Sequence, residues 1–319
     1  WPGCSATTTT AWFSREFDKM AQQEMTYSKA IRQAMVEEME RDPNVFLMGE
    51  DVGTFGGVWG VSEGMLDLFG DRRVRDTPIS EIAIVGAGLG AAMVGMRPIV
   101  EIMFGDFLMC AGDQIANQVA KARFMSGGKA KVPLTIRVTT GAPGSAAAQH
   151  SQSPESWFMN VPGLKIAVPA TPQDAKGLLK SAIRGEDPVL YFEPKMLYAE
   201  TGPVSDGADD LVPFGQAKVV REGSDVTVIA IGVMRKHALA AAETLEQQGI
   251  SIEIVDPRTL VPLDRDTLVA SVAKTSRVVI AHEAHLRSGP GAEIAAVLAE
   301  EAIEYLDGPI ARVGAKNVP

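Results

Sequence analysis

One acidic residue of the sequence stands where its surroundings could change its chemistry. Glu81 is the only charged residue between Asp76 and Arg97, and it begins a stretch of small and apolar residues that predicts a helix. A carboxyl group taken out of water keeps a proton more readily, which suits hydrogen-bond donation to a ring nitrogen. The alternative, which the sequence alone favours, is that Glu81 occupies the third helical position, with Thr77 or Ser80 as the cap, and satisfies backbone donors.

A histidine in a predicted loop is the second candidate for proton chemistry. His150 ends the stretch GSAAAQH, which follows the predicted strand VPLTIRV. A lone histidine is more often a structural hydrogen-bonding residue than a catalyst. Loops after strand ends are, however, where α/β proteins build sites, and the small neighbours of His150 leave room for a ligand. We therefore predict that His150 lies in a functional site and takes part in proton transfer.

A glycine pattern near Glu81 weakly resembles a dinucleotide-binding fingerprint. It consists of Gly86, Gly88 and Gly90, with Asp106 twenty positions after the first glycine. In a true fingerprint the glycines form a tight turn directly after a strand, whereas here they fall inside the predicted helix. The pattern therefore argues against a nicotinamide-dependent oxidoreductase. It favours close packing of this helix against another helix or a second copy of the chain.

Two further patterns have equally good structural explanations. Residues 49–64 combine two acids with a glycine-rich loop after a predicted strand, but they lack the lysine of a phosphate loop, so an ordered surface loop is an equal alternative. His282 and His285 stand three residues apart with only Glu283 nearby. Because no third ligand occurs at a recognisable spacing, we predict no metal site there.

The composition restricts the class of protein. The chain has 319 residues, of which 46% are hydrophobic and 22% charged, and its formal net charge is -10. These values are typical of a globular α/β protein, and the acidic charge argues against nucleic acids and anionic membranes as partners. The sequence has no apolar run long enough for a bilayer, no signal-peptide pattern at its start and no paired cysteines. We expect a cytoplasmic protein that binds small molecules and other proteins.

Short β-like runs alternate with helical stretches along most of the sequence. This alternation predicts an α/β fold in which mainly parallel strands are joined by crossover helices. A polar stretch with glycine and proline interrupts the alternation, which then restarts. We therefore predict an N-terminal appendage over residues 1–24, a first domain over 25–195, a linker over 196–215 and a second domain over 216–319.

Eight motifs in a fixed order point to one family. They are MGEDV, DTPISE, RPIVEIMFGDF, DQIANQVAK, MSGG, AAAQHSQS, PGLKIAVP and DAKGLLKSAIR. From about Met25 to its end the sequence closely resembles the beta subunit of the thiamine-diphosphate-dependent 2-oxo acid dehydrogenase component, including its pyruvate, branched-chain and acetoin branches. The resemblance implies two three-layer α/β domains, namely a transketolase-like pyrimidine-binding domain and a transketolase C-terminal domain. It also implies an alpha2-beta2 heterotetramer.

The resemblance assigns roles to four residues. Thiamine diphosphate would lie between subunits, with its diphosphate and magnesium held mainly by the alpha subunit and its aminopyrimidine by the beta subunit. Glu81 resembles the family glutamate that hydrogen-bonds the aminopyrimidine nitrogen. Met103 and Phe107 match positions that line the aminopyrimidine. His150 matches the histidine that faces the reactive carbon of the cofactor, and it would move a proton there and assist transfer to the lipoyl group.

A structural potassium site, made mostly of backbone carbonyls, is also common in the family. By resemblance, its ligands would come from Leu134, Thr135, Ala182, Gly185 and Asp187. Gly185 replaces a residue that is often acidic or polar in the family, and Asp187 stands where asparagine is usual.

The resemblance implies oxidative decarboxylation of a 2-oxo acid, such as pyruvate or a branched-chain 2-oxo acid, and acyl transfer to a lipoyl-bearing acyltransferase. AAAQHSQ is similar to the acetoin and pyruvate branches, whereas SQSPESWF and FEPKMLY are similar to the branched-chain branch. An acetoin dehydrogenase beta subunit is therefore one alternative. A non-catalytic assembly subunit and a nicotinamide dehydrogenase are alternatives of other classes. Glu81 and His150 argue against the assembly subunit, because a scaffold needs no acid in an apolar helix.

Overall fold

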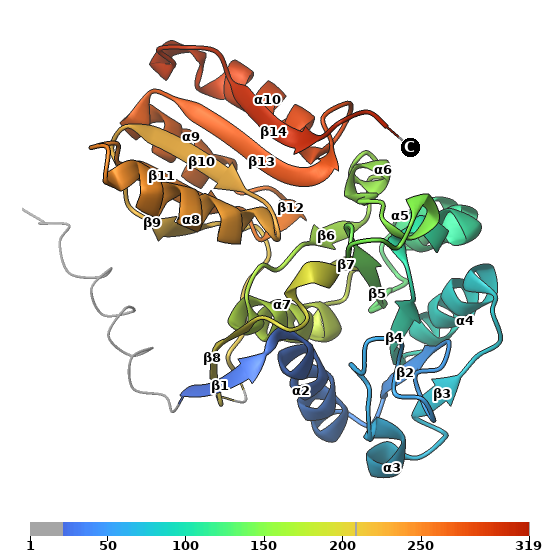
Figure 1. The fold of residues 1–319 in the computed structure, drawn as a ribbon. Helices are drawn as coiled ribbons and strands as arrows, with labels where there is room; N and C mark the ends of the chain where they lie inside the picture. The colour runs from blue at the N-terminus through green and yellow to red at the C-terminus, as the bar shows by residue number, and fades with distance from the viewer. Residues whose placement is uncertain (1–21, 208, 319) are drawn as a thin grey trace, which may run out of the picture.

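Two sheets, each flanked by helices, make up most of the structure (Figure 1). The computed structural model describes residues 22–207 and 209–318. The first sheet has seven strands in the order β12-β6-β7-β5-β4-β2-β3, and the second has five in the order β14-β13-β10-β11-β9. A separate ribbon pairs β1 with β8. Within the described residues, no helix is both long and apolar enough to cross a membrane.

The first sheet is parallel except at one edge, where β12 pairs antiparallel with β6. Its strands are β2 (Val45–Gly49), β3 (Val74–Asp76), β4 (Arg97–Ile102), β5 (Thr135–Thr140), β6 (Lys165–Ala167), β7 (Val189–Pro194) and β12 (Thr259–Val261). The α-helices of this unit are α2 (Tyr27–Arg41), α3 (Met65–Phe69), α4 (Glu81–Met93), α5 (Ala120–Met125), α6 (Glu155–Met159) and α7 (Pro172–Arg184). Its shorter helical segments are η2 (Gly105–Ala111), η3 (Gln114–Val119), η4 (Ala148–His150) and η5 (Lys195–Leu197).

Successive residues of the central strands belong to two different cores. In β2, Val45 and Leu47 are part of the apolar cluster that includes α2 and α7, whereas Phe46 and Met48 are part of the cluster that includes α4 and α6. Neighbouring side chains of a strand point to opposite faces of the sheet, so an apolar run is buried on both faces only when helices cover both. The structure thus confirms the predicted three-layer α/β arrangement.

Capping residues fix where the two helices of one face begin. Thr26 accepts a hydrogen bond from the amide of Lys29 at the start of α2. Thr171 does the same for Asp174 at the start of α7, where Pro172 is the first helical residue. A hydroxyl cap satisfies an amide that has no partner within the helix, and proline suits the first position because it has no amide proton. Local sequence therefore determines both helix starts.

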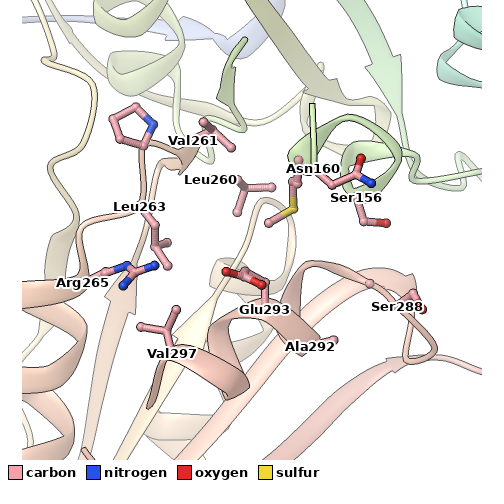
Figure 2. A pocket seen from close by; sticks show the side chains of 13 residues that line it. Ser156, Asn160, Leu260, Val261, Leu263, Arg265, Ser288, Ala292, Glu293 and Val297 are labelled. Atoms are coloured by element: carbon pink, nitrogen blue, oxygen red, sulfur yellow. The ribbon is translucent and has the colours of Figure 1, made fainter. Parts of the chain in front are cut away.

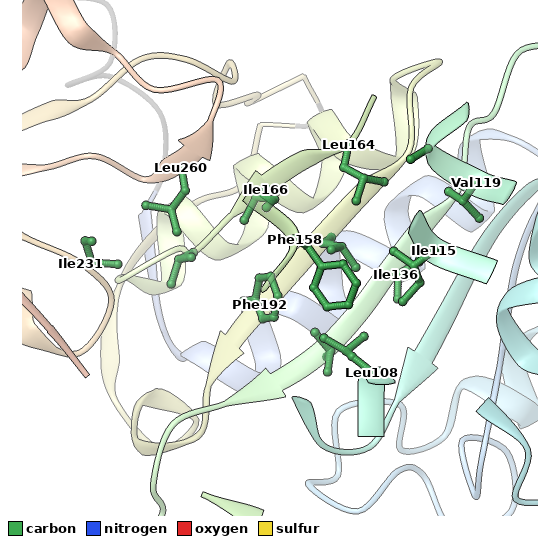
Figure 3. Close-up of a cluster of buried hydrophobic side chains, with 14 of the residues drawn as sticks. Leu108, Ile115, Val119, Ile136, Phe158, Leu164, Ile166, Phe192, Ile231 and Leu260 are labelled. Atoms are coloured by element: carbon green, nitrogen blue, oxygen red, sulfur yellow. The ribbon is translucent and has the colours of Figure 1, made fainter. Parts of the chain in front are cut away.

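The second sheet is parallel except for β9, which pairs antiparallel with β11. An apolar cluster continues from the first unit into the second: Figure 3 shows Ile231 and Leu260 beside Ile166 and Phe192. The strands of the second sheet are β9 (Lys218–Arg221), β10 (Val226–Ala230), β11 (Ile252–Asp256), β13 (Val278–His285) and β14 (Ala311–Ala315). Its helices are α8 (Met234–Glu246), α9 (Arg265–Thr275), α10 (Pro290–Glu301) and η6 (Ile303–Tyr305). The ribbon strands are β1 (Gln22–Thr26) and β8 (Thr201–Ser205).

The structure differs from the predicted domain organisation in three segments. β1 begins at Gln22, so the last residues of the expected appendage 1–24 form part of a strand, while residues 1–21 lie outside the described part of the chain. The expected linker 196–215 contains β8, which pairs with β1. β12 belongs to the second domain in sequence but extends the first sheet. Strand pairing between distant segments produces these differences, and local turn signals do not report it.

The glycines near Glu81 lie inside α4, as predicted, and one of them sets how closely the helix approaches the sheet. A Cβ atom at Gly88 would lie 2.8 Å from Cγ1 of Val100 on β4. A Cβ atom at Gly86 would lie 3.7 Å from Oε1 of Gln114, and one at Gly90 would have no such neighbour within 4 Å. The close packing at Gly88 is therefore against the sheet, while packing of this helix against a second copy of the chain stays a prediction.

Candidate active site

Four neighbouring parallel strands bring the predicted site residues to one edge of the first sheet (Figure 1). The carboxyl ends of parallel strands meet at the same edge, which is where α/β proteins build sites. Glu50 follows β2, Glu81 follows β3, Phe107 follows β4 and His150 follows β5. The segment η2, which holds Phe107, contacts α4, β5 and η4. The fold therefore brings α4, which begins with Glu81, and η4, which ends with His150, into contact with the same segment η2.

Glu81 is the first residue of α4 and is half-buried. Its cap residue Ser80 makes no side-chain hydrogen bond to the helix, and the hydroxyl of Thr77 is buried without a partner. The capping interpretation is therefore wrong, because Glu81 occupies the first helical position and not the third. Two large apolar side chains beside it, Ile79 and Ile82, are 83% and 50% exposed. The single chain thus leaves the surroundings of Glu81 more open to water than the sequence predicts.

A second acid, Glu50, lies within the electrostatic range of Glu81. Burial raises the pKa of Glu50, and the negative charges of Glu81, Asp51 and Glu101 raise it further. The sequence analysis noted the acids of residues 49–64 but did not single out Glu50. The signal that could have found it is its position directly after β2, at the same sheet edge as Glu81.

His150 ends the short helix η4, and two aromatic rings hold its imidazole. The ring centroids of Phe104 and Phe107 lie 4.6 and 5.5 Å from that of His150, each in an edge-on arrangement. The amide of Gly141 donates to the carbonyl of Gln152 at 3.0 Å, which joins the two ends of the connecting segment. We call residues 141–152 the His150 loop. Phe104, which the sequence analysis did not select, thus contacts His150 more closely than the selected Phe107.

Met103 reaches this region through its backbone. Its carbonyl accepts a hydrogen bond of 2.6 Å from Oγ1 of Thr139, the penultimate residue of β5. This bond joins the end of β4 to the end of β5, because Met103 comes directly after β4. Met103 is therefore placed between the strand that leads to Phe107 and the strand that leads to His150.

A buried lysine, Lys195, contacts the backbone of His150. Nζ of Lys195 donates to the carbonyl of His150 at 2.8 Å and lies 5.3 Å from the ring centroid of Phe104. Burial lowers the pKa of Lys195, although the negative charges of Asp106, Glu283 and Glu155 act in the opposite direction. Sequence reasoning missed this residue, because it used FEPKMLY only as a family signature.

A buried carboxyl group, that of Glu155, and a half-buried one, that of Glu283, lie near the ends of the His150 loop. Oε1 of Glu155 accepts a hydrogen bond of 2.6 Å from Oγ1 of Thr140, and burial raises the pKa of Glu155. Burial, and then the charge of Glu155, raises the pKa of Glu283 to about 7. Glu283 belongs to β13 of the second domain, and its carboxylate oxygens lie 2.7 Å from where a Cβ of Gly141 would be. The second domain therefore contributes an acid to this side of the site.

Comparisons with known proteins decide the family. Residues 23–201 match the transketolase pyrimidine-binding domain, and residues 215–319 match the transketolase C-terminal domain. The pyruvate dehydrogenase E1 component subunit beta-2, mitochondrial, of Oryza sativa subsp. japonica is 46% identical over 302 residues, which are 94% of this chain and 80% of that protein. The 2-oxoisovalerate dehydrogenase subunit beta of Bacillus subtilis is 46% identical over 295 residues, with 92% and 90% covered. The chain belongs to the transketolase-like family of dehydrogenase beta subunits.

Two further comparisons extend this family result. The acetoin:2,6-dichlorophenolindophenol oxidoreductase subunit beta of Bacillus subtilis is also 46% identical, over 307 residues that cover 92% of this chain and 90% of that protein. A solved structure described as a split gene transketolase, inactive beta4 tetramer, superimposes with a TM-score of 0.76 at 27% identity. The superposition covers 92% of this chain and 90% of the other. The family inferred from the sequence motifs and the transketolase-like fold are both confirmed.

The residues matched to the potassium site of the family already have charged partners. The carboxylate of Asp187 forms ion pairs with Arg123 and, at 2.9 Å, with Lys165. Burial alone would raise the pKa of Asp187, but Lys165 and Arg123 lower it. The carbonyl of Gly185 accepts a hydrogen bond of 2.7 Å from the guanidinium of Arg97. At these two residues, cationic side chains of this chain therefore bind the oxygen atoms that the resemblance assigns to the metal ion.

The other matched residues add no charge. The carbonyl of Leu134 accepts from the amide of Val189 at 2.9 Å, that of Ala182 accepts from the amide of Gly185 at 3.2 Å, and Thr135 is buried in β5. In the described ranges, no group of three or more His, Cys, Asp or Glu side chains is placed to hold a metal ion. The potassium site that the resemblance implies consists mostly of backbone carbonyls, and it stays a prediction.

A cavity of about 580 Å³ between α6, β12 and α10 lies apart from the family site (Figure 2). Its walls include Leu260 and Glu293, and Arg265 beside them forms an ion pair of 2.6 Å with Glu301. None of the predicted catalytic residues lines it. Among the described residues, no buried side-chain atom without a hydrogen-bond partner lies in its walls. Shape alone therefore does not make it a site.

Glu283→Gln is expected to change how stability depends on pH. The pKa of Glu283 is raised, so this group binds more protons in the native chain than in the unfolded chain between about pH 4.5 and 7, and its contribution to stability falls as the pH rises through this window. The glutamine cannot ionise but still accepts hydrogen bonds. At pH 8 the variant should gain about 2 kcal/mol relative to wild type, less than the full shift implies because the carboxyl group is partly exposed.

Urea denaturation at pH 5, 6, 7 and 8 measures this effect. Glu300→Gln, an exposed residue on α10 of the same domain, is the control and should follow the wild-type pH dependence. Equal pH dependence of stability in wild type and Glu283→Gln would show that Glu283 does not titrate in this window.

Proposed function

We propose that this chain is the catalytic beta subunit of a thiamine-diphosphate-dependent 2-oxo acid dehydrogenase. The reaction is oxidative decarboxylation of a 2-oxo acid such as pyruvate or a branched-chain 2-oxo acid, with transfer of the acyl group to a lipoyl-bearing acyltransferase. The observation that carries the proposal is that α4, which begins with Glu81, and η4, which ends with His150, both contact the aromatic segment η2. The identity to dehydrogenase beta subunits supplies the class of reaction.

The residues present fit one half of the cofactor. The rings of Phe104 and Phe107 offer an apolar wall beside His150, and Glu81 offers a carboxyl group at a helix start. Glu81, Met103 and Phe107 would hold the aminopyrimidine. The sequence has no phosphate loop, and the described residues hold no acidic cluster for magnesium, so the diphosphate and its metal fall to the alpha subunit.

Each residue of this chain has a separate task in the proposed reaction. Thiamine diphosphate, when bound, supplies the nucleophilic carbon and takes up the electron pair that carbon dioxide leaves behind. The carboxyl group of Glu81 would hold a proton at a ring nitrogen of the aminopyrimidine and so determine its tautomer. His150 would donate or accept a proton at the substrate oxygen. Phe104 and Phe107 restrict the imidazole to one orientation and exclude water from one side of it.

An exposed apolar surface beside Glu81 supports an alpha partner. Ile79 and Ile82 flank the acid and are 83% and 50% exposed, although large apolar side chains are normally covered in the assembled protein. The solved transketolase relative that contains beta chains alone is described as inactive. We therefore propose an alpha2-beta2 heterotetramer in which the alpha subunit covers Ile79 and Ile82 and completes the site.

Acetoin is the second candidate substrate. The acetoin-oxidising relative and the 2-oxoisovalerate relative are both 46% identical to this chain, so overall identity does not separate the two branches. Cleavage of acetoin would use the same residues, because thiamine diphosphate would supply the same nucleophilic carbon and the product would again be an acyl group for transfer. We keep the cytoplasm as the proposed compartment, although the rice relative is named as mitochondrial.

The test is turnover by the chain assembled with its alpha subunit. Reduction of an artificial electron acceptor would be followed with pyruvate, branched-chain 2-oxo acids and acetoin, with and without thiamine diphosphate. Cofactor-dependent turnover of one substrate, strongly lowered but still measurable in His150→Ala, is the expected result and names the branch. A well-formed complex that turns over none of them would overturn the catalytic proposal in favour of an assembly subunit.

A further inference from the structure

We propose that Lys195 is a positioning residue for His150, and that it acts together with Glu283 of the second domain. This inference rests on the proposed function of His150. It concerns residues that do not touch the substrate themselves but hold the loop that carries the histidine.

The first observation is how Lys195 contacts both parts of His150. Its side chain is buried, with the residue 5% exposed, and Nζ donates to the backbone carbonyl of His150 at 2.8 Å. The same ammonium group lies 5.3 Å from the ring centroid of Phe104, and the imidazole packs on that ring with a centroid distance of 4.6 Å. Lys195 thus fixes the backbone of His150 directly and its ring through Phe104.

The second observation is the charge balance around this lysine. In the part of the chain that the structure describes, Lys195 forms no direct ion pair, and its hydrogen-bond acceptor is the His150 carbonyl. Asp106, Glu155 and Glu283 act on it from a distance. A buried ammonium group without a direct partner lowers the stability of a protein. The hydrogen bond to the carbonyl of His150 is therefore the direct polar contact that the buried ammonium group of Lys195 makes.

The third observation is that the His150 loop needs support from outside. Ser145 and Ala147 have φ angles of 56° and 62°, a conformation that side chains other than glycine adopt at a cost. The carboxylate oxygens of Glu283 lie 2.7 Å from where a Cβ of Gly141 would be, at the beginning of the loop, and Lys195 binds its end at His150. The two charged residues hold the strained segment from two different domains.

The expected effect of Lys195→Met follows from these contacts. The methionine fills a similar volume but offers neither a donor nor a charge, so His150 loses its fixed position while the substrate contacts of other residues remain. We expect kcat to fall by about 10- to 100-fold with little change in KM, as small displacements of a catalytic group have effects of this size. Lys195→Arg keeps a charge and donors and should recover part of the lost kcat.

The experiment is a double-mutant cycle of Lys195→Met and His150→Ala in the complex with the alpha subunit. If Lys195 acts through His150, its substitution lowers kcat in the wild-type background but by less than about twofold when His150 is already alanine. Lys176→Met is the matched control. Lys176 on α7 is also buried and also donates to a carbonyl, that of Ser205 at 3.0 Å, but unlike Lys195 it forms an ion pair, with Glu37 at 2.8 Å. It should lower Tm without lowering kcat.

The outcomes separate this inference from the proposed function. Equal loss of kcat from Lys195→Met in both backgrounds, or an equal loss from Lys176→Met, would overturn the positioning role and leave the proposed function intact. Full activity of His150→Ala alone would overturn both. If Lys195→Met does not assemble, Lys195→Gln, which keeps a donor but removes the charge, takes its place in the cycle and is expected to give the same pattern.

Discussion

Glu81→Gln in the assembled complex is expected to lower kcat by about 10²- to 10⁴-fold, the range typical of losing a proton-transferring group. Glutamine has nearly the same shape as glutamate and can occupy the same first position of α4, but it cannot exchange a proton with a ring nitrogen. Removal of the acid should therefore change the chemistry and not the fold. The measurement is steady-state turnover with the preferred substrate, together with Tm.

A control at another glutamate tests whether the loss of a surface carboxylate alone lowers kcat. Glu63→Gln removes the charge of an exposed glutamate in the segment between β2 and α3, and it should leave kcat unchanged. Comparable activity of Glu81→Gln and wild type, at saturating cofactor, would contradict the role of Glu81. A loss that disappears at high thiamine diphosphate would instead assign Glu81 to cofactor binding alone.

Arg137→Met is expected to destabilise the chain by about 3–5 kcal/mol, the cost typical of leaving buried charges unpaired. The guanidinium of Arg137 lies between Glu101 at 2.7 Å and Glu193 at 2.7 and 2.9 Å, all in the interior of the first sheet. Burial alone would lower the pKa of Arg137, but Glu193 and Glu101 raise it. Without the arginine, two carboxylates remain buried with no cation. Urea denaturation at pH 7 measures the loss.

The stability lost on removing an arginine depends on how exposed its ion pair is. A second arginine, Arg123, tests this dependence. Arg123 pairs with Asp187 while their side chains are 44% and 34% exposed, so Arg123→Met should cost less than about 1 kcal/mol. Arg137→Met combined with Glu101→Gln and Glu193→Gln should recover much of the stability, because no unpaired charge is then buried. Similar losses in Arg137→Met and Arg123→Met would refute this explanation.

Patterns that are local in the sequence predict a large part of this structure. The alternation of apolar strands with helical segments indicates the α/β fold, and position after a strand correctly places His150 at the sheet edge. Glu81 is correctly placed at a helix start, although its helical position is two residues earlier than the capping interpretation requires. These predictions succeed because hydrophobic periodicity and strand–loop order are properties of neighbouring residues.

The remaining parts of the site depend on residues that are distant in sequence. Lys195 stands 45 positions after His150, and Glu283 belongs to another domain, so no local pattern reports that both reach the same loop. Burial, which changes the proton affinity of Glu155 and Glu283, is also a property of the packed chain and not of the residue type. For the same reason the sequence does not reveal that β12 joins the first sheet.

The position of β12 means that the two halves of this chain are not independent modules. Its three residues come from the C-terminal half but hydrogen-bond to β6 at the margin of the N-terminal sheet, and the apolar cluster runs through both. Exchange of the C-terminal half for that of a relative would therefore replace a strand of the neighbouring sheet as well. The boundary between the two exchangeable halves therefore lies inside the first sheet. A chimaera keeps the edge of that sheet intact only if β12 and β6 come from the same protein.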